Sequence, residues 1–331
     1  MRILLTLLFG VISLFAKGDV VVSILPQKYF VEKIAGDTVK IDVMVLPGAS
    51  PASYEPKSSQ MKHLENADIY FSIGVPFEKV WLKKFKSQIP SLNIVATDEG
   101  VVKRSMHHHD HDEHHEHHEH GEAEHEHHED HEHATHNEHE IEEEVGCDPK
   151  KDSDCYCHEH ENGEMFCHTH RGLDPHIWLD PRLVIVQAQN IEKALIKAYP
   201  ENEELYKART SSFIKELNAL HNDIKDRLKD LKGRKFMVFH PSWGYFAKRY
   251  GFEQIPVEKE GKEPKPAELQ KLIKLAKEEN IKVIFVAPQF SKKSANIIAK
   301  ESGIKVVELD PLPQDWMKGM EKVVKSFENN I

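Results

Sequence analysis

Residues 203–231 read EELYKARTSSFIKELNALHNDIKDRLKDL. The apolar residues of this stretch recur at spacings of three, four and seven, which predicts one face of an amphipathic helix. They are Tyr206, Phe213, Leu217, Leu220, Ile224 and Leu231. Such a helix would be roughly 45 Å long at about 1.5 Å per residue. Because short strands are predicted on both sides of it, we expect this helix to connect two parts of the molecule.

Short β-branched runs alternate with helical patterns before and after the long helix. Strands are predicted at residues 20–25, 40–46, 69–74, 92–97, 235–240, 252–258, 282–288 and 304–309. Helices are predicted between the first four strands, after Pro181, and at residues 266–279, 292–302 and 315–328. This alternation is typical of parallel sheets covered by helices. The predicted fold class is therefore α/β, with two parallel-sheet lobes joined by one long rigid helix.

The expected domain boundaries follow from these patterns. They give an N-terminal lobe over residues 17–201, a connecting helix over 202–231 and a C-terminal lobe over 232–331. Residues 1–16 have a positive start, a short apolar centre and a small residue at the end, which is typical of a cleavable signal peptide. We therefore expect a periplasmic protein whose mature chain begins near Lys17.

A histidine-rich and acidic insert lies within the N-terminal lobe, over residues 105–170. The run from His107 to His170 holds 20 of the 24 histidines. The insert contains 22 acidic and 2 basic side chains, so its net charge is −20 and that of the remaining chain is +9. Few of its residues up to 145 are apolar, and we expect that part to be a mobile tether. Imidazole suits zinc, copper, nickel and iron, so the insert indicates that the protein handles a transition metal.

All four cysteines, Cys147, Cys155, Cys157 and Cys167, lie in the same insert. An even number of cysteines in an exported protein favours two disulfides, for which three pairings are available. The histidines between and beside them, at 158, 160, 168 and 170, would equally suit a thiolate and imidazole metal site. Both interpretations stand at this point.

Three candidate metal ligands outside the insert lie at strand ends or in a turn. His176 lies in the turn Leu-Asp-Pro-His-Ile-Trp-Leu-Asp-Pro, His240 ends a predicted strand, and Asp310 ends another. Open α/β sheets place their ligands at the carboxyl ends of their strands. We therefore predict a metal site in the cleft between the lobes, built from His176, His240 and Asp310. His63 and His221 lie in helical patterns and are predicted to be surface residues.

At these motifs the chain resembles the metal-binding proteins of ABC importers for zinc and manganese. The resemblance extends over nearly the whole mature chain. It rests on Ser-Ile-Leu-Pro (23–26), Leu-Pro-Gly-Ala-Ser-Pro (46–51), Tyr-Glu-Pro (54–56), Asp-Pro-His-Ile-Trp-Leu-Asp-Pro (174–181), Phe-His-Pro-Ser-Trp-Gly-Tyr-Phe (239–246), residues 260–269, Pro-Gln-Phe-Ser (288–291) and Leu-Asp-Pro-Leu (309–312). The resemblance implies that His176, His240 and Asp310 bind the metal. A histidine at position 240 and a histidine-rich loop resemble the zinc-selective members, so manganese is less expected.

One position departs from the family pattern. The family has a histidine ligand where this chain has Ala52, between Pro51 and Ser53. Since zinc prefers four ligands, the three side chains leave one position for water, a second Asp310 oxygen, Glu55 or a histidine of the insert. We expect water or the insert.

The resemblance implies a monomeric protein that captures zinc and delivers it to an ABC-type permease in the inner membrane. The alternative is a periplasmic metal buffer or chaperone, or a metal-dependent adhesin that acts in cell adhesion. An enzyme is not expected, because the chain has no His-Glu-x-x-His motif and no evident general base beside the three ligands. Nucleic-acid binding is not expected either, because the basic residues are spread along helices without interleaved aromatic residues.

Overall fold

We analysed a computed structural model of the chain, which describes residues 17–106, 155–159, 165–169, 173–258 and 261–331. The chain divides into two compact units. The larger unit comprises Met1–Arg104 and Asp174–Ile331, and the smaller unit comprises Ser105–Leu173. The predicted signal peptide and most of the predicted tether lie outside the described residues.

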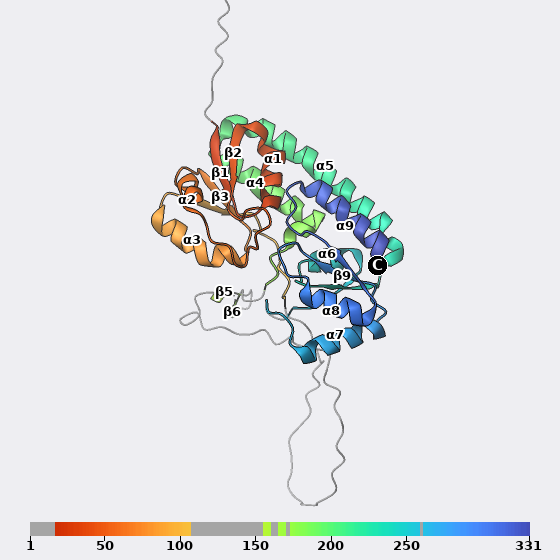
Figure 1. The fold of residues 1–331 in the computed structure, drawn as a ribbon. Coiled ribbons are helices and arrows are strands. Elements are labelled where there is room, and N and C mark those ends of the chain that lie inside the picture. Colours follow the sequence, from red (N-terminus) through yellow and green to blue (C-terminus); the bar gives the residue numbers. More distant parts are fainter. Residues whose placement is uncertain (1–16, 107–154, 160–164, 170–172, 259–260) are drawn as a thin grey trace, which may run out of the picture. The chain divides into compact units, whose positions relative to one another are not determined.

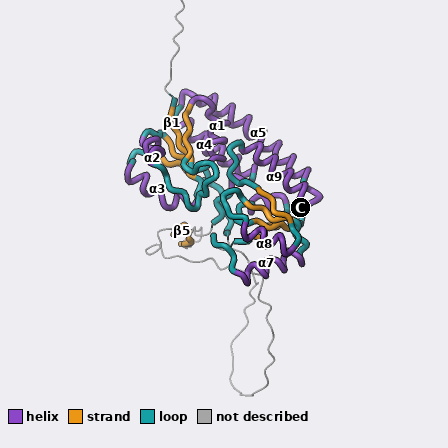
Figure 2. The backbone as a smooth tube through the Cα atoms, viewed as in Figure 1, coloured by secondary structure: helices purple, strands orange, loops and turns teal. Residues whose placement is uncertain are grey.

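The larger unit contains two four-stranded parallel sheets, which are separate in Figure 2. The first has the order β2-β1-β3-β4 and consists of β1 (Gly18–Val22), β2 (Val39–Val43), β3 (Ile69–Ser72) and β4 (Asn93–Ala96). The second has the order β10-β9-β7-β8 and consists of β7 (Lys235–Val238), β8 (Glu253–Pro256), β9 (Val283–Val286) and β10 (Lys305–Glu308). The predicted α/β fold class is confirmed, and each of the eight predicted strands is present in shorter form.

The strands β3 and β9 show why the sequence forms parallel sheets. All four residues of β3 and all four of β9 are buried. Strands of a parallel sheet are covered by helices on both faces, so they consist of continuous apolar runs without polar alternation. Their sequences, Ile-Tyr-Phe-Ser and Val-Ile-Phe-Val, have this character.

Helices cover these sheets and connect their strands (Figure 1). In the first lobe they are α1 (Leu25–Ala35), α2 (Ser58–Glu65), α3 (Pro76–Gln88) and α4 (Pro181–Ala198). In the second lobe they are α6 (Gly244–Tyr250), α7 (Pro266–Glu278), α8 (Lys293–Ser302) and α9 (Trp316–Asn330). Proline lies in the first turn of α3, α4 and α7, where its missing N–H costs no helical hydrogen bond. No helix among the described residues has the length and apolar character needed to cross a membrane.

The long helix α5 (Glu203–Arg227) packs against both lobes. Four residues of the predicted stripe, Tyr206, Phe213, Leu217 and Ile224, are buried, and α5 packs on α1, α4 and α9. Arg227 ties its end to α9, because its guanidinium contacts Glu321 at 2.8 Å and Glu328 at 2.7 Å. After Arg227 the chain continues as a short 3-10 helix, Lys229–Leu231, so the α-helix is shorter than the predicted 202–231.

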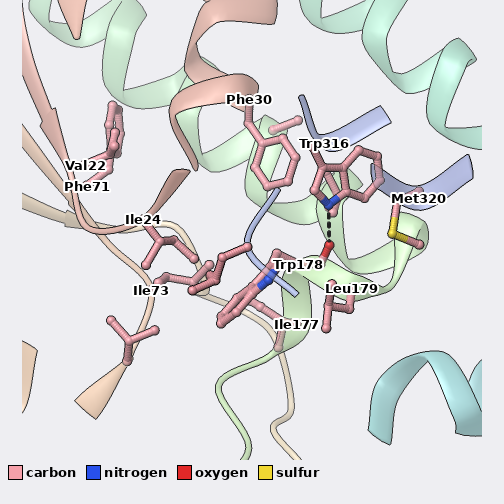
Figure 3. Close-up of a cluster of buried hydrophobic side chains, with 14 of the residues drawn as sticks. Val22, Ile24, Phe30, Phe71, Ile73, Ile177, Trp178, Leu179, Trp316 and Met320 are labelled. Carbon is pink, nitrogen blue, oxygen red and sulfur yellow. Dashed lines mark hydrogen bonds between the residues drawn. The ribbon is translucent and has the colours of Figure 1, made fainter. Parts of the chain in front are cut away.

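A buried tryptophan pair joins the two lobes at the centre of the core (Figure 3). The indole N–H of Trp178 donates to the carbonyl of Pro311 at 2.7 Å, and that of Trp316 donates to the carbonyl of Trp178 at 2.8 Å. Trp316 also packs edge to face on Phe30 of α1, with 5.3 Å between the ring centroids. Because both indoles are at most 1% exposed, each N–H needs a protein partner. We call this arrangement the tryptophan clasp.

A buried carboxylate joins the carboxyl ends of β1 and β3. Glu78 of α3 accepts from the Ser23 hydroxyl at 2.5 Å and from the backbone N–H groups of Ile73 at 2.9 Å and Gly74 at 2.7 Å. The Ser23 hydroxyl also hydrogen-bonds the Tyr70 hydroxyl at 2.6 Å. Burial raises the pKa of Glu78 to about 7, despite these hydrogen bonds.

The raised pKa of Glu78 predicts a pH-dependent stability. Below the ordinary pKa of 4.5 the side chain is protonated whether the chain is folded or unfolded. Between there and about pH 7 the unfolded chain loses this proton first, so this contribution destabilises the fold as the pH rises. We expect Glu78→Gln to gain about 2–3 kcal/mol of stability relative to wild type between about pH 5 and about pH 8. Urea unfolding at both pH values checks this, with the exposed Glu65→Gln on α2 as the control. A pH-independent difference would contradict it.

The smaller unit contains an antiparallel pair, β5 (Cys155–Glu159) and β6 (Met165–Thr169). Its register pairs Cys157 with Cys167 and Tyr156 with His168. The first and last residues of this unit also pair, since Ser105 and Leu173 form an isolated antiparallel β-bridge.

Candidate metal site

His176 and His240 come from different lobes and lie side by side. His176 precedes the 3-10 helix Ile177–Leu179, and His240 follows β7. Their ring centroids are 5.2 Å apart, with the ring planes at 69°. Two imidazoles that bind one zinc ion tetrahedrally, with Zn–N bonds of about 2.0–2.1 Å, have centroids roughly 5 Å apart. The pair is therefore spaced as two ligands of one zinc ion would be.

A buried carboxylate forms a hydrogen bond with the Nδ1 atom of each histidine ring. Asp174 Oδ1 lies 2.8 Å from His176 Nδ1, and Glu258 Oε1 lies 2.5 Å from His240 Nδ1. Asp174 is 3% exposed and Glu258 is 5% exposed. A neutral imidazole that donates from Nδ1 keeps the lone pair of Nε2 for a metal, and this arrangement is common behind zinc ligands. Both rings are therefore oriented by a carboxylate.

Packing fixes the two rings further. His176 is buried, and burial lowers its pKa, although the neighbouring Asp174 acts in the opposite direction. A lowered pKa favours the neutral form that binds metal. The ring of His240 stacks on Phe290, with 5.0 Å between centroids and 23° between planes.

Asp310 follows β10, and the tryptophan clasp connects its turn to that of His176. Its Oδ1 accepts from the Leu312 N–H at 2.9 Å and from the Gln289 amide at 3.1 Å. The Trp178 indole, two residues after His176, donates to the carbonyl of Pro311. Within the described ranges, no three His, Cys, Asp or Glu side chains are grouped closely enough to hold a metal ion. The structure thus brings the two histidines together and places Asp310 on the adjoining turn.

The other candidate ligands lie elsewhere or outside the described residues. Ala52 and Glu55 are exposed in the segment between β2 and α2. His63 Nδ1 lies 3.3 Å from Asp42 Oδ2, beside a cavity of about 320 Å³ lined by β2, α1 and α2 residues. His221 Nδ1 lies 3.2 Å from the Tyr250 hydroxyl. The histidines at 107–139 lie outside the described residues, as do His160, His170 and Cys147.

The sequence reasoning missed Asp174 and Glu258. Asp174 lies two residues before His176, so a carboxylate behind that ring had a local signal in Asp-Pro-His. Glu258 had no local sequence signal, because it lies 18 residues after His240 and contacts it from the segment that follows the neighbouring strand β8.

Known proteins resemble this chain in sequence and in fold. The family model of ZnuA, described as "Zinc-uptake complex component A periplasmic", matches residues 20–330. The chain belongs to the ZnuA family. A solved ZnuA structure has a TM-score of 0.73 and 34% identity, and the match covers 95% of this chain and 99% of that one. A deletion mutant of ZnuA solved with zinc bound gives the same TM-score and identity.

Two relatives match this chain over about half of their own length or less. "Zinc-binding protein AdcA" of Streptococcus pyogenes serotype M3 is 28% identical over 300 residues, which cover 89% of this chain and 50% of the relative. "High-affinity zinc uptake system protein ZnuA" of Bacillus subtilis is 35% identical over 142 residues, which cover 42% of this chain and 44% of that protein. The chain thus spans about half the length of the AdcA relatives it matches. ZnuA is described as periplasmic, so this family is extracytoplasmic.

Substitution of either carboxylate that hydrogen-bonds a site histidine is expected to weaken metal binding in this ZnuA-family chain. Substitution of such partners typically costs 10–100-fold in affinity. We expect Asp174→Asn and Glu258→Gln each to weaken zinc binding by about 10–100-fold, because a neutral amide oxygen accepts the Nδ1–H hydrogen bond more weakly than a carboxylate and adds no negative charge behind the ring. Competition titration against a zinc-binding dye measures this, with Asp42→Asn beside His63 as the matched control. Affinities of both variants within about twofold of wild type would contradict the assignment.

Proposed function

We propose that this chain is an extracytoplasmic solute-binding protein that captures zinc and delivers it to an ABC-type permease of the inner membrane. The observation that carries the proposal is the pair of histidines whose ring centroids lie 5.2 Å apart, each hydrogen-bonded at Nδ1 by a buried carboxylate. Membership of the ZnuA family and the zinc named for AdcA and for the solved ZnuA support zinc as the cargo. The proposed role is binding and release, with no catalytic step.

The proposed zinc ligands are the Nε2 atoms of His176 and His240 and a carboxylate oxygen of Asp310. No hydrogen bond to either Nε2 atom is found among the described residues. Asp310 uses Oδ1 for its two hydrogen bonds, which orients the carboxyl group and keeps Oδ2 for an ion. Water or an insert histidine would complete four-coordination, because Ala52 offers no ligand atom.

Export and partner recognition complete the proposal. A signal peptide over residues 1–16 would direct the chain out of the cytoplasm. The permease would recognise a monomer through surfaces of both lobes. The proposal keeps the domain boundaries expected from the sequence, with lobes over residues 17–201 and 232–331 and residues 202–231 between them.

The structure allows the insert to be removed cleanly for a test. The Asp174 N–H donates to the Arg104 carbonyl at 2.7 Å, so the two ends of the larger unit meet where the insert begins. Residues 105–173 can therefore be replaced by a short glycine linker without moving His176. We call this form the excised protein.

Calorimetric zinc titration of the full chain and of the excised protein tests the proposal. We expect the excised protein to keep one tight site and to lose only the additional zinc bound by the insert. If the excised protein binds no zinc tightly, an insert histidine is a required ligand. If His176→Ala in the full chain then leaves tight zinc binding unchanged, the paired histidines are not a capture site and the proposal fails. The zinc-loaded excised protein should also stimulate ATP hydrolysis by membranes that contain the permease. This result would distinguish a transport component from a metal buffer.

A further inference from the structure

One segment of the second lobe contacts two of the proposed zinc ligands. Strand β9 lies between β7 and β10 in its sheet, and His240 and Asp310 follow these two neighbouring strands. The residues after β9 therefore emerge between the two ligands, at the carboxyl edge of the sheet. Gln289 donates its Nε2–H to Asp310 Oδ1 at 3.1 Å, and Phe290 stacks on His240 with 5.0 Å between ring centroids. Two consecutive side chains thus each contact one proposed ligand.

The side-chain amide of Gln289 has a buried oxygen without a partner. A carboxylate only accepts hydrogen bonds, so the amide turns its nitrogen, and not its oxygen, toward Asp310. Gln289 Oε1 is buried and forms no hydrogen bond with any described residue. A buried acceptor of this kind costs free energy, so native proteins rarely leave one without a protein group, a water or an ion. Its place beside a proposed ligand indicates a partner that arrives with the zinc ion.

Chemistry favours a zinc-bound water over the zinc ion itself as this partner. Zinc in proteins takes nitrogen, thiolate and carboxylate ligands, whereas amide oxygens are typical ligands of calcium. An open zinc site carries a water in its fourth position, and the charge of the ion makes this water a strong hydrogen-bond donor.

The reach of such a water agrees with the position of Gln289. A Zn–O bond is about 2.0–2.2 Å long, and an O–H···O hydrogen bond spans about 2.7–2.8 Å. A zinc-bound water therefore serves an acceptor roughly 4–5 Å from the ion. Gln289 lies one hydrogen bond away from Asp310, which is compatible with this distance.

We propose that Gln289 Oε1 accepts a hydrogen bond from a zinc-bound water that occupies the fourth position of the site. The proposal rests on the proposed zinc site of His176, His240 and Asp310. Gln289 then acts through two atoms, since its Nε2–H orients the Asp310 carboxylate and its Oε1 positions the water.

This arrangement also selects which molecule fills the fourth position. An amide oxygen carries a partial negative charge, so it attracts the hydrogen atoms of a water and repels an anion. Leucine is similar in size to glutamine and has neither effect. We expect Gln289→Leu to weaken zinc binding about 10-fold, because the water loses its acceptor. The same variant should bind azide at the metal about 10-fold more tightly, because one hydrogen bond no longer favours the water over the anion.

Cobalt(II) in place of zinc makes this exchange visible, because its absorption bands change when azide replaces water. The full chain is loaded with one equivalent of cobalt and titrated with azide, and zinc affinity is measured separately by competition with a dye. Gln289→Glu keeps an acceptor oxygen and loses the N–H that contacts Asp310, so it separates the two roles. We expect tighter azide binding in Gln289→Leu and not in Gln289→Glu. The exposed Gln314→Leu is the matched control and should behave as wild type.

Thermal unfolding of the metal-free variants shows that each is folded, and Gln289→Met replaces the leucine variant if that one is not. Azide and zinc affinities of the apolar variant within about twofold of wild type would overturn the proposal. Tighter azide binding in Gln289→Glu as well would also overturn it, because the effect would then arise from the lost contact with Asp310.

His240→Ala separates this inference from the proposed function. If His240→Ala keeps tight cobalt binding, the proposed zinc site itself is wrong. If His240→Ala loses tight binding while Gln289→Leu behaves as wild type, the zinc site stands and only the role of Gln289 fails.

Discussion

Replacement of His240 by alanine in the excised protein is expected to weaken zinc binding by about 100-fold or more. Structural zinc sites are worth about 10–16 kcal/mol in apparent free energy for four ligands, or roughly 3 kcal/mol for each ligand. A loss of that size corresponds to about two powers of ten in Kd. His240 is one of two imidazoles at the site, so few side chains can take over its role.

Zinc-dependent stabilisation gives the measurement a second readout. A ligand at about 100 times its Kd raises the free energy of unfolding by about 2.7 kcal/mol. The excised parent should show this increase in thermal unfolding, and His240→Ala should show almost none at the same zinc concentration. The matched control is His221→Ala, which removes a histidine of α5 that contacts Tyr250. An affinity of His240→Ala within about threefold of the parent would rule out His240 as a ligand.

The largest expected loss of stability comes from Trp316→Ala. Trp316 is 0% exposed, packs on Phe30 and donates its indole N–H to the Trp178 carbonyl. Removal of a fully buried tryptophan side chain typically costs about 3–5 kcal/mol. It would also leave the buried Trp178 carbonyl without its partner, which adds to the cost. Urea denaturation measures the change, with the partly exposed Trp81→Ala on α3 as the control.

The conservative variant Trp178→Phe tests whether the tryptophan clasp also serves the site. It keeps an aromatic ring and removes the hydrogen bond to the Pro311 carbonyl, which lies next to Asp310. We expect a stability loss of about 1–3 kcal/mol and a weaker zinc affinity in the protein that remains folded.

For the Trp316→Ala variant described above, a stability within about 1 kcal/mol of wild type would show that the tryptophan clasp does not hold the lobes together.

Much of the fold was predictable because its signals are local. The runs Val-Val-Val-Ser-Ile-Leu and Val-Ile-Phe-Val are apolar and β-branched. The first three residues of the former lie in β1, which begins two residues before the predicted 20–25, and the latter forms β9 within the predicted 282–288. The stripe from Tyr206 to Ile224 identified α5 from its own spacing. The position of each lobe's strands in its sheet was not predictable, since the orders β2-β1-β3-β4 and β10-β9-β7-β8 depend on contacts between distant segments.

The candidate site was predictable only in part. His176 and His240 stood out because motif turns and strand ends carry function in open α/β folds. Glu258 did not, because its role arises from the parallel pairing of β7 and β8, which brings it to His240. The same holds for the tryptophan clasp, since 138 residues separate Trp178 from Trp316.

The sequence by itself determined most of the strands and helices of the two lobes, where the acidic insert lies and which histidines stand outside it; it predicted neither β5 and β6 nor α6. These properties depend on composition and short-range periodicity, which do not require the chain to be folded. Only the tertiary structure decided that His176 and His240 meet, that Asp174 and Glu258 orient them, and that Cys157 is opposed by Cys167. Such pairings bring together residues distant along the chain or depend on register, and a register is fixed by hydrogen bonding and burial across strands.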